Sequence, residues 1–238
     1  MKSAPATAMV LAAGFGLRMR PLTNKTPKPL ITIGGVPMIE RILDHLVDAG
    51  IDDVVINTHY LASQFFTYFD GRTNPKIKII HEETLLDTGG GVANALPFLG
   101  GDAFLVLNSD VVILKGKTPL IQRLTDTWDS NVMDALLLLQ PIENSFGYSG
   151  PGDFHLQTNG LLQRSTKGTY APFLFTGVQM LKRSLFRSAP PSPFSLNFLY
   201  DHAQENGRLY GVVHDGEWMH VGTPNAMRKA EIYIRNLE

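Results

Sequence analysis

Short, continuously apolar runs alternate with helical patterns along most of this 238-residue chain. Strands that are apolar on both sides are typical of a sheet buried on both faces, and the intervening helices supply the covering layers. The pattern therefore predicts an α/β fold with a mostly parallel sheet and helices on both faces. The predicted strands are residues 9–13, 53–57, 77–81, 104–108, 135–140, 173–180 and 209–214.

Helical periodicity fills several of the segments between these strands. Apolar residues recur every three or four positions over residues 36–49, and Gly50 then stops that helix. Further helices are predicted at residues 62–69, 90–96 and 224–237. From about residue 141 to residue 175 the pattern breaks into glycine, serine, proline and aromatic residues. We expect this stretch to form a loop or hairpin over the carboxyl edge of the sheet, where open α/β folds bind ligands.

The composition narrows the class of function. A formal net charge of −1 argues against a non-specific nucleic-acid binder, which carries a strong positive excess. The chain has no cysteine, which excludes disulfides, thiolate metal sites and cysteine nucleophiles. The apolar stretch at residues 8–13 is far shorter than the roughly 18 residues that a membrane span needs. We therefore expect a cytoplasmic protein with no nucleic-acid or membrane partner.

The most informative segment is the basic, glycine-containing stretch LAAGFGLRMRPLTNKTPKPL at residues 11–30. Gly14 and Gly16 follow a predicted strand, so their turn exposes backbone N–H groups at the strand end. The segment holds Arg18 and Lys28 among several cations and has no acidic residue. Backbone N–H groups and cations together favour a polyphosphate-binding loop. The prolines on both sides of Lys28 restrict the backbone around that one lysine, which a mere surface charge does not require.

Three familiar loop motifs do not fit this chain. A dinucleotide fingerprint over the two glycines needs a third glycine where Met19 stands. The run GKT at residues 116–118 is similar to the end of a Walker loop, but the first glycine of that loop falls on Val111. A nucleophile elbow near residue 149 lacks its final glycine, because Pro151 occupies that position. The loop at residues 11–30 therefore belongs to another class.

This loop resembles the signature of the sugar-1-phosphate nucleotidylyltransferases, a strand followed by GxGxRMxPLTxxxPKPL. The chain matches every specified position of that signature between Gly14 and Leu30. The resemblance extends over nearly the whole chain. In detail it is closest to the bacterial N-acetylmuramate 1-phosphate uridylyltransferases of cell-wall recycling, and residues 85–100, 150–154 and 217–224 carry this narrower resemblance.

The resemblance implies a Rossmann-like fold of the nucleotide-diphospho-sugar transferase type, with a mixed, mostly parallel sheet. It implies a single nucleotidyltransferase domain over residues 1–238, with the nucleotide over about residues 1–115 and the sugar over about residues 116–238. We expect a monomer or a small homo-oligomer.

The implied reaction transfers UMP from UTP to a sugar 1-phosphate and releases pyrophosphate. The expected acceptor is N-acetylmuramate 1-phosphate. Within the class, the alternative is a hexose 1-phosphate, such as that of glucose or mannose, with another base from TTP or GTP. Outside it, the alternative is a non-catalytic nucleotide-sugar sensor on the same fold.

The resemblance also assigns roles to particular residues. As the expected catalytic residues, Arg18 would hold the β and γ phosphates, Lys28 the α phosphate, and Asp110 the metal. Glu82 stands where relatives often place a glutamine that contacts the pyrimidine, and its carboxylate can accept the N3–H of uracil. An exposed charge at a strand end is the alternative for Glu82. The expected nucleotide-binding residues are Ala13, Gly14, Gly16, Glu82, Thr88, Gly89, Gly90 and Asn108.

Mg²⁺ is the cofactor that the resemblance implies, and Mn²⁺ or a similar ion is the alternative. Asp110 follows an apolar strand, and one or two carboxylates with phosphate oxygens suffice for Mg²⁺. A helix cap is the alternative role for Asp110. His220 stands where relatives have a second carboxylate, and imidazole suits softer divalent ions better than Mg²⁺. Asp215 or Glu217 is the alternative source of that carboxylate.

The expected sugar-binding residues lie in the irregular region and in the strand that follows it. Backbone N–H groups and the side chains of Asp153 and Thr176 can hydrogen-bond hydroxyls, and the ring of Phe154 or Tyr148 can pack on the sugar. Ordinary turns are the alternative for these segments. Lys167 or Arg164 is expected to meet the lactyl carboxylate of a muramic acid. The expected residues are Gly147, Asp153, Phe154, Thr176 and Gly177.

Overall fold

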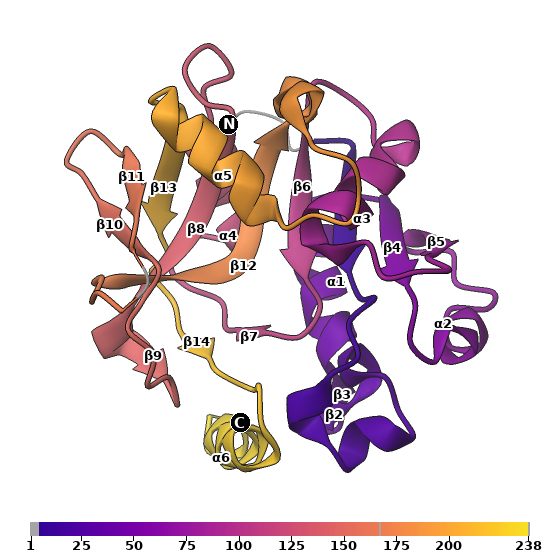
Figure 1. Ribbon diagram of the computed structural model, residues 1–238. Helices are drawn as coiled ribbons and strands as arrows, with labels where there is room; N and C mark the ends of the chain where they lie inside the picture. The colour runs from indigo at the N-terminus through magenta and orange to yellow at the C-terminus, as the bar shows by residue number, and fades with distance from the viewer. Residues whose placement is uncertain (1–4, 167, 238) are drawn as a thin grey trace.

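The structure, a computed structural model, describes residues 5–166 and 168–237 (Figure 1). Within these ranges the main sheet is nine-stranded, and its strands are β1 (Thr7–Leu11), β4 (Asp53–Thr58), β5 (Lys76–His81), β6 (Ala103–Asn108), β8 (Ala135–Pro141), β10 (Phe154–Leu156), β11 (Leu162–Arg164), β12 (Phe173–Lys182) and β13 (Leu209–Val213). Strand β12 runs antiparallel to its neighbours β6 and β8, while β5, β4, β1, β6, β8 and β13 all run in one direction. The expected mixed, mostly parallel sheet is therefore confirmed.

Helices cover both faces of this sheet. The α-helices are α1 (Met38–Asp48), α2 (Ala62–Tyr68), α3 (Asp87–Ala95), α4 (Leu120–Thr127), α5 (Leu196–Glu205) and α6 (Pro224–Arg235), of which the first five pack on the faces of the sheet. On one face α1, α2 and α4 contribute Ile42, Phe65 and Leu124 to a buried cluster with the strands. Helices α3 and α5 lie on the other face (Figure 1). There they contribute Val92 and Leu199 to a second buried cluster. The expected two-sided covering is confirmed.

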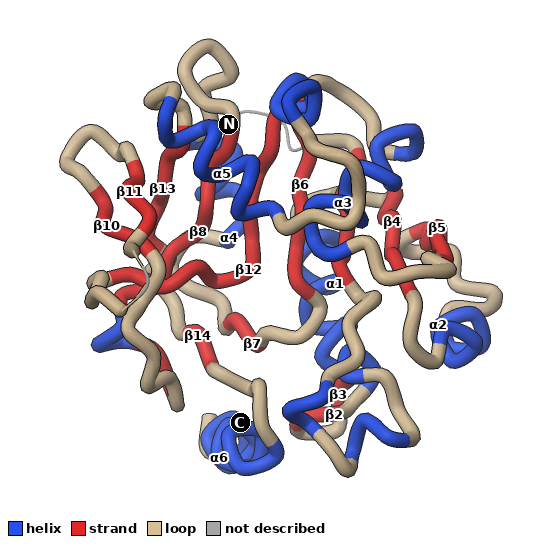
Figure 2. The backbone as a smooth tube through the Cα atoms, in the orientation of Figure 1, coloured by secondary structure: helices blue, strands red, loops and turns tan. Residues whose placement is uncertain are grey.

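A third buried cluster lies at the carboxyl edge of the parallel strands, where the loops that follow β1 and β6 run (Figure 2). Short strands frame it, namely β2 (Thr32–Ile33), β3 (Val36–Pro37), β7 (Val112–Ile113), β9 (Ser145–Phe146) and β14 (Trp218–Met219). Ala230 and Ile234 of α6 share this cluster with Met19 and Met219. The C-terminal helix therefore supports the segment that carries the basic glycine loop.

The predicted elements are confirmed with boundaries within three residues at each end. The helix predicted from residue 36 begins at Met38, because Val36 and Pro37 form β3 and pair with β2. The irregular region contains the predicted hairpin, which is β10 with β11. Helices α4 and α5 are additional to the predicted set. In the described parts of the chain, none of the helices combines the length and apolar character needed to cross a membrane.

His45 on α1 makes the folded protein sensitive to acid. Its ring is buried and its Nε2 is 3.0 Å from the carbonyl oxygen of Ile113. Burial lowers the pKa of His45 below its ordinary value of 6.5, although the hydrogen bond to Ile113 opposes this shift. The unfolded chain therefore binds a proton at a higher pH than the folded protein does. Stability is unaffected by this group above the unfolded pKa and is lost as the pH falls below it.

We expect His45→Gln to flatten the loss of unfolding free energy between pH 7 and pH 5, because glutamine keeps a donor for Ile113 but does not titrate. Urea unfolding at several pH values measures the effect. The matched control is His202→Gln on α5, since His202 is exposed. Identical pH slopes for the wild-type protein and His45→Gln would show that His45 does not contribute.

Candidate active site at the carboxyl edge of the sheet

A cavity of about 260 Å³ lies at the carboxyl ends of β1, β4 and β6. Parallel strands bring their carboxyl ends to one edge, so loops that are distant in sequence meet there. Of the expected residues, this cavity is lined by Ala13, Gly14, Gly16, Lys28, Glu82, Thr88, Asn108 and Asp110. It is also lined by Leu85 and Asp87, from the stretch 85–100 that carries the narrower resemblance, and by Asn57 and Ser109, which were not among the expected residues. Asn57 is the penultimate residue of the apolar strand β4 and Asn108 is the last residue of β6, and this position near a strand end could have identified Asn57.

The glycine loop is held by contacts within itself and with the loop after β4. Gly16 has φ of +62° and begins a short 3₁₀ turn, and its carbonyl accepts a hydrogen bond from Thr23 Oγ1 at 2.9 Å. The Tyr60 hydroxyl donates to the Thr23 carbonyl at 2.9 Å. The exposed Phe15 ring meets the His59 ring edge-on, with centroids 5.3 Å apart. These contacts fix the loop over the end of β1.

Gly16→Ala is expected to destabilise the protein by about 1–3 kcal/mol more than Gly35→Ala does. Both glycines have positive φ, so both substitutions carry backbone strain. A Cβ at Gly16 would also lie 2.9 Å from Thr23 Cγ2 and 3.1 Å from Lys28 Cβ, whereas one at Gly35 would have no neighbour within 4 Å. Urea unfolding of both variants measures the difference. Equal losses would show that the loop tolerates the extra carbon.

Lys28 and Asp110 form an ion pair at one end of the cavity. Lys28 Nζ donates to Asp110 Oδ2 at 2.7 Å, and these side chains are 9% and 39% exposed respectively. Pro27 and Pro29 flank the lysine and leave its side chain directed across to the loop after β6. The pair therefore places a buried cation beside a partly solvated carboxylate, 82 residues apart in sequence.

His220 lies close enough to Arg18, Lys28 and Asp110 for their charges to affect it. Burial lowers the pKa of His220, the nearby cations Arg18 and Lys28 lower it further, and Asp110 opposes them. Arg18 is exposed and does not line the cavity itself. The structure thus brings Arg18, Lys28 and Asp110 within electrostatic range of His220. The neutral imidazole of His220 is the form that these surroundings favour.

The alternative carboxylates lie elsewhere. Asp215 forms an ion pair with Arg123, and Glu217 accepts a hydrogen bond from the Tyr233 hydroxyl at 2.7 Å. Both line a separate cavity near α6. The structure therefore does not bring Asp215 or Glu217 to the Lys28–Asp110 pair, and His220 is the residue of this segment that faces it.

Glu82 is buried at the end of β5, which contradicts the alternative of an exposed strand-end charge. Its Oε1 accepts from Asn57 Nδ2 at 2.7 Å, and its Oε2 accepts from the Leu86 backbone N–H at 3.1 Å. Asn57 Oδ1 in turn accepts from the Ala12 backbone N–H at 3.0 Å. Both carboxylate oxygens of Glu82 are therefore engaged by the protein. Gly89 and Gly90, also expected here, are buried in α3 and donate to the Phe194 carbonyl.

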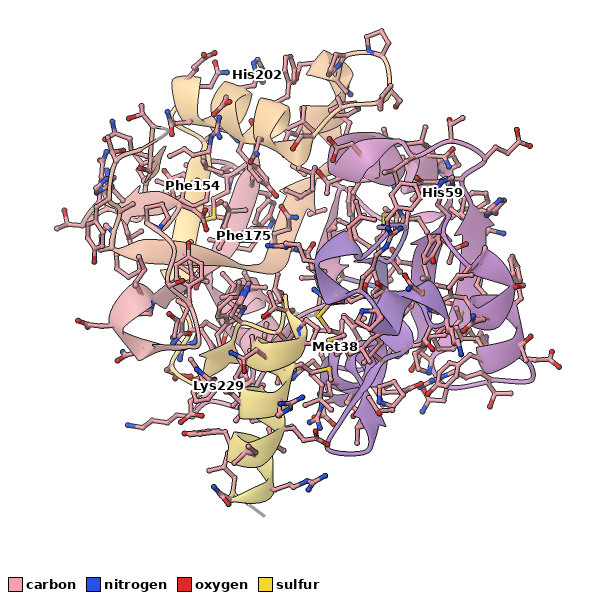
Figure 3. All side chains as sticks on the ribbon, turned by 60° about the horizontal axis from the view of Figure 1, so that its bottom comes forward. Met38, His59, Phe154, Phe175, His202 and Lys229 are labelled. Atoms are coloured by element: carbon pink, nitrogen blue, oxygen red, sulfur yellow. The ribbon has the colours of Figure 1, made fainter. Side chains whose placement is uncertain are left out.

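Among the expected sugar-binding residues, some side chains are buried and cannot contact a ligand. Figure 3, which brings the bottom of the Figure 1 view forward, shows Phe154 and Phe175 on one side of the molecule and His59 on the other. Phe154 is 3% exposed and packs in the core, so its ring is not available to stack on a sugar. Thr176 is fully buried, and its hydroxyl donates to the Leu138 carbonyl at 2.8 Å. The side-chain roles expected for Phe154 and Thr176 do not fit these positions.

Gly177 remains well placed. It has φ of +90°, and a Cβ there would lie 2.9 Å from Asn108 Nδ2, so glycine lets β12 approach the end of β6. Gly147 is exposed in the irregular region. Asp153 Oδ2 accepts from the Phe175 backbone N–H at 2.8 Å, and burial raises the pKa of this carboxyl group. Of these residues, Gly177 packs against Asn108, which lines the cavity.

Arg164 is engaged by the protein itself. Its Nε donates to Asp201 at 2.7 Å, and a second guanidinium nitrogen bonds the other carboxylate oxygen. A bidentate pair of this kind leaves less of the guanidinium for a substrate carboxylate. Lys167, the other residue expected at the lactyl group, lies outside the described residues.

Comparison with known proteins defines the class. Residues 7–153 match the family model for nucleotidyl transferase. The chain therefore belongs to the nucleotidyl transferase family and is a nucleotidyltransferase enzyme, so the family assignment made from the glycine loop is confirmed.

Two relatives match nearly the whole chain. The chain is 38% identical to the N-acetylmuramate alpha-1-phosphate uridylyltransferase of Caulobacter vibrioides, over 97% of this chain and 98% of that protein. It is 34% identical to the enzyme of the same name from Neisseria meningitidis, over 94% and 96%. A solved structure of UDP-glucose pyrophosphorylase complexed with UDP-glucose aligns over 100% of both chains with a TM-score of 0.81 and 14% identity, and so shares the fold.

Proposed function

We propose that this enzyme transfers UMP from UTP to N-acetylmuramate 1-phosphate, releases pyrophosphate, and serves cell-wall recycling in the cytoplasm. The observation that carries the nucleotidyl transfer is the Lys28–Asp110 pair, held at 2.7 Å beside the glycine loop. The uridylyl and muramate parts of the proposal are supported by the names of the two relatives that match nearly the whole chain.

The reaction needs no protein nucleophile. An oxygen of the sugar phosphate attacks the α-phosphorus of UTP in line, a new P–O bond forms, and the bond to the β-phosphate oxygen breaks. Pyrophosphate leaves with the electron pair of that bond. In this proposal Lys28 neutralises charge at the α-phosphate, and Arg18 neutralises charge at the leaving phosphates. Rate enhancement then comes from positioning and electrostatic stabilisation.

The donor groups at this end of the cavity suit a divalent cation such as Mg²⁺. The Asp110 carboxylate is partly solvated, and Mg²⁺ is commonly held by one or two carboxylates together with substrate phosphates. No group of three or more acidic or histidine side chains that could hold a metal occurs in the described ranges. A metal site with one protein carboxylate, completed by substrate phosphate oxygens, is consistent with these side chains. Asp110 would hold the ion, which would supply positive charge at the reacting phosphates.

The test is product formation across a panel of UTP, TTP, GTP and CTP with muramate, glucosamine, glucose and mannose 1-phosphates. Pyrophosphate release and chromatography of the nucleotide sugar are read together. We expect UTP with N-acetylmuramate 1-phosphate to be the best pair. A faster reaction with another pair would overturn the substrate assignment but keep the class. UTP binding without any product from the panel would instead favour a nucleotide-sugar sensor.

His220→Asp is expected to raise activity with Mg²⁺ relative to Mn²⁺ by about tenfold, within the range seen when groups around a metal are changed. An imidazole favours softer divalent ions, whereas a carboxylate suits Mg²⁺. The measurement is turnover as a function of each metal's concentration. His220→Asn is the matched control, because it has the size of aspartate without the charge. An unchanged metal preference in His220→Asp would remove His220 from the metal's surroundings.

A further inference from the structure

Asn57 is a buried amide at the meeting point of four chain segments. It lies in β4 and is 3% exposed. Its Oδ1 accepts the Ala12 backbone N–H at 3.0 Å, and its Nδ2 donates to Glu82 Oε1 at 2.7 Å. Glu82 Oε2 accepts the Leu86 backbone N–H at 3.1 Å. This chain of hydrogen bonds connects the ends of β1, β4 and β5 to the entry of α3.

The chain of bonds has a fixed polarity. A backbone N–H is always a donor, so Ala12 requires an acceptor from residue 57 and Leu86 requires one from residue 82. The bond between the two side chains then needs one donor and one acceptor. An amide opposite a carboxylate meets all three requirements, and two amides or two carboxylates do not. An unmet donor or acceptor at this depth carries a desolvation cost.

Helix α3 packs tightly against the side chains of Asn57 and Glu82. A Cβ at Gly91 of α3 would lie 2.7 Å from Asn57 Nδ2 and 2.9 Å from Glu82 Oε1. Contacts below 3.0 Å force something to move, so Gly91 lets α3 approach the pair closely. Ala12, Asn57 and Glu82 also line the nucleotide cavity. Any shift of the pair therefore changes the walls of that cavity.

We propose that Asn57 and Glu82 are a positioning pair that sets the shape of the base-binding part of the nucleotide cavity through Ala12 and Leu86. Glu82 acts through this framework, because it is only 3% exposed and each of its carboxylate oxygens already accepts a hydrogen bond from the protein. The proposal rests on the nucleotidyl-transfer function, and it assigns base binding to the surrounding backbone.

The test exchanges the two functional groups. Asn57→Asp places two carboxylates opposite each other, so neither can donate to the other. Glu82→Gln places two amides opposite each other, so one of the three hydrogen bonds to Ala12, to Leu86 and between the side chains is lost. The double variant Asn57→Asp/Glu82→Gln reverses the pair: the introduced carboxylate accepts from Ala12 and from the new amide, whose oxygen accepts from Leu86. We expect each single variant to raise both the Kd and the KM for UTP by about tenfold or more, with a smaller change in kcat. The double variant should return both constants to within about threefold of the wild-type values.

Isothermal titration with UTP measures Kd apart from turnover, and a comparison of UTP with CTP measures base selection. If the double variant binds UTP as weakly as Glu82→Gln and selects poorly, the carboxylate contacts the base directly and the proposal fails. Normal UTP binding by both single variants would also overturn it. Asn94→Asp is the matched control, because Asn94 is exposed on the same helix α3.

A second variant covers the case in which a single exchange prevents folding. Gly91→Ala adds one carbon against Asn57 and Glu82 without changing their chemistry, and alanine suits a helix better than glycine does. It should fold and bind UTP about tenfold more weakly. Wild-type UTP affinity in Gly91→Ala would contradict the positioning role. If the wild-type protein forms product with another nucleotide, the wild type, both single variants and the double variant are compared with that nucleotide instead. An error in the proposed substrate is thereby distinguished from an error in the positioning role of Asn57 and Glu82.

Discussion

Replacement of Lys28 by methionine is expected to lower kcat by about a hundred- to a thousand-fold while the fold is retained, which is the range for removal of a group that stabilises transition-state charge. The side chain is nearly buried beside Asp110, so its ammonium acts where water screens little. Methionine keeps an unbranched chain of similar length and loses the charge. The Asp110 carboxylate is 39% exposed and stays hydrated without its partner.

The measurement is kcat with both substrates saturating, together with urea unfolding of the same preparation. Lys25→Met is the matched control, because Lys25 is an exposed cation of the same loop. We expect Lys25→Met to keep turnover within about threefold of wild type, as surface charges contribute little. Near-normal turnover in folded Lys28→Met would refute the electrostatic role of Lys28 and leave the lysine as a structural partner of Asp110.

The strands of the sheet were predictable because each one is marked by a pattern within its own few residues. Runs such as Val54–Ile56 are apolar on consecutive residues, which predicts strands buried on both faces, and residues 53–57 indeed lie in β4. The start of α1 was not predictable in the same way. Val36 continues the helical periodicity, but it pairs with Ile33 across a turn, and pairing partners are not visible in a periodic pattern.

The cavity at the carboxyl edge of the sheet was also largely predictable, since residues at the ends of parallel strands meet at one edge. Asp110 and Asn108 follow that rule, and so does Asn57. The sugar side was harder because β12 changes register between Phe175 and Gln179. A bulge reverses which side chains face the core, and no alternation in the sequence reveals it. Thr176 was expected at the sugar because of the family resemblance, whereas its side chain is buried against β8.

Glu82 shows a different limit of sequence reasoning. The family resemblance indicated Glu82 as a site residue, and Glu82 does line the cavity. Its partners depend on Asn57, which is 25 residues away in the chain, and on the close approach that Gly91 permits. The sequence can indicate that a carboxylate lies at the site, but the contacts that occupy its oxygens are a property of the folded chain.

Asp110→Asn is expected to lower turnover about a hundredfold or more at every Mg²⁺ concentration, because an amide oxygen lacks the charge that a divalent cation requires. The substitution keeps the shape of the side chain, and Lys28 can still donate to the amide oxygen. Its effect on unfolding should be small, since the carboxylate is partly solvated. Asp70→Asn is the matched control, because Asp70 is exposed.

Metal binding separates this variant from Lys28→Met. Electron paramagnetic resonance with Mn²⁺, in the presence of a UTP analogue that cannot react, reports bound metal without turnover. We expect Asp110→Asn to lose bound Mn²⁺ and Lys28→Met to retain it, although both lose activity. If Asp110→Asn retains the metal, its carboxylate serves only as the ionic partner of Lys28, 2.7 Å away, and the two variants then fail for one shared reason. A loss of metal confined to Asp110→Asn instead assigns the two charges of the pair to different tasks, the carboxylate to the cation and the ammonium to the phosphate.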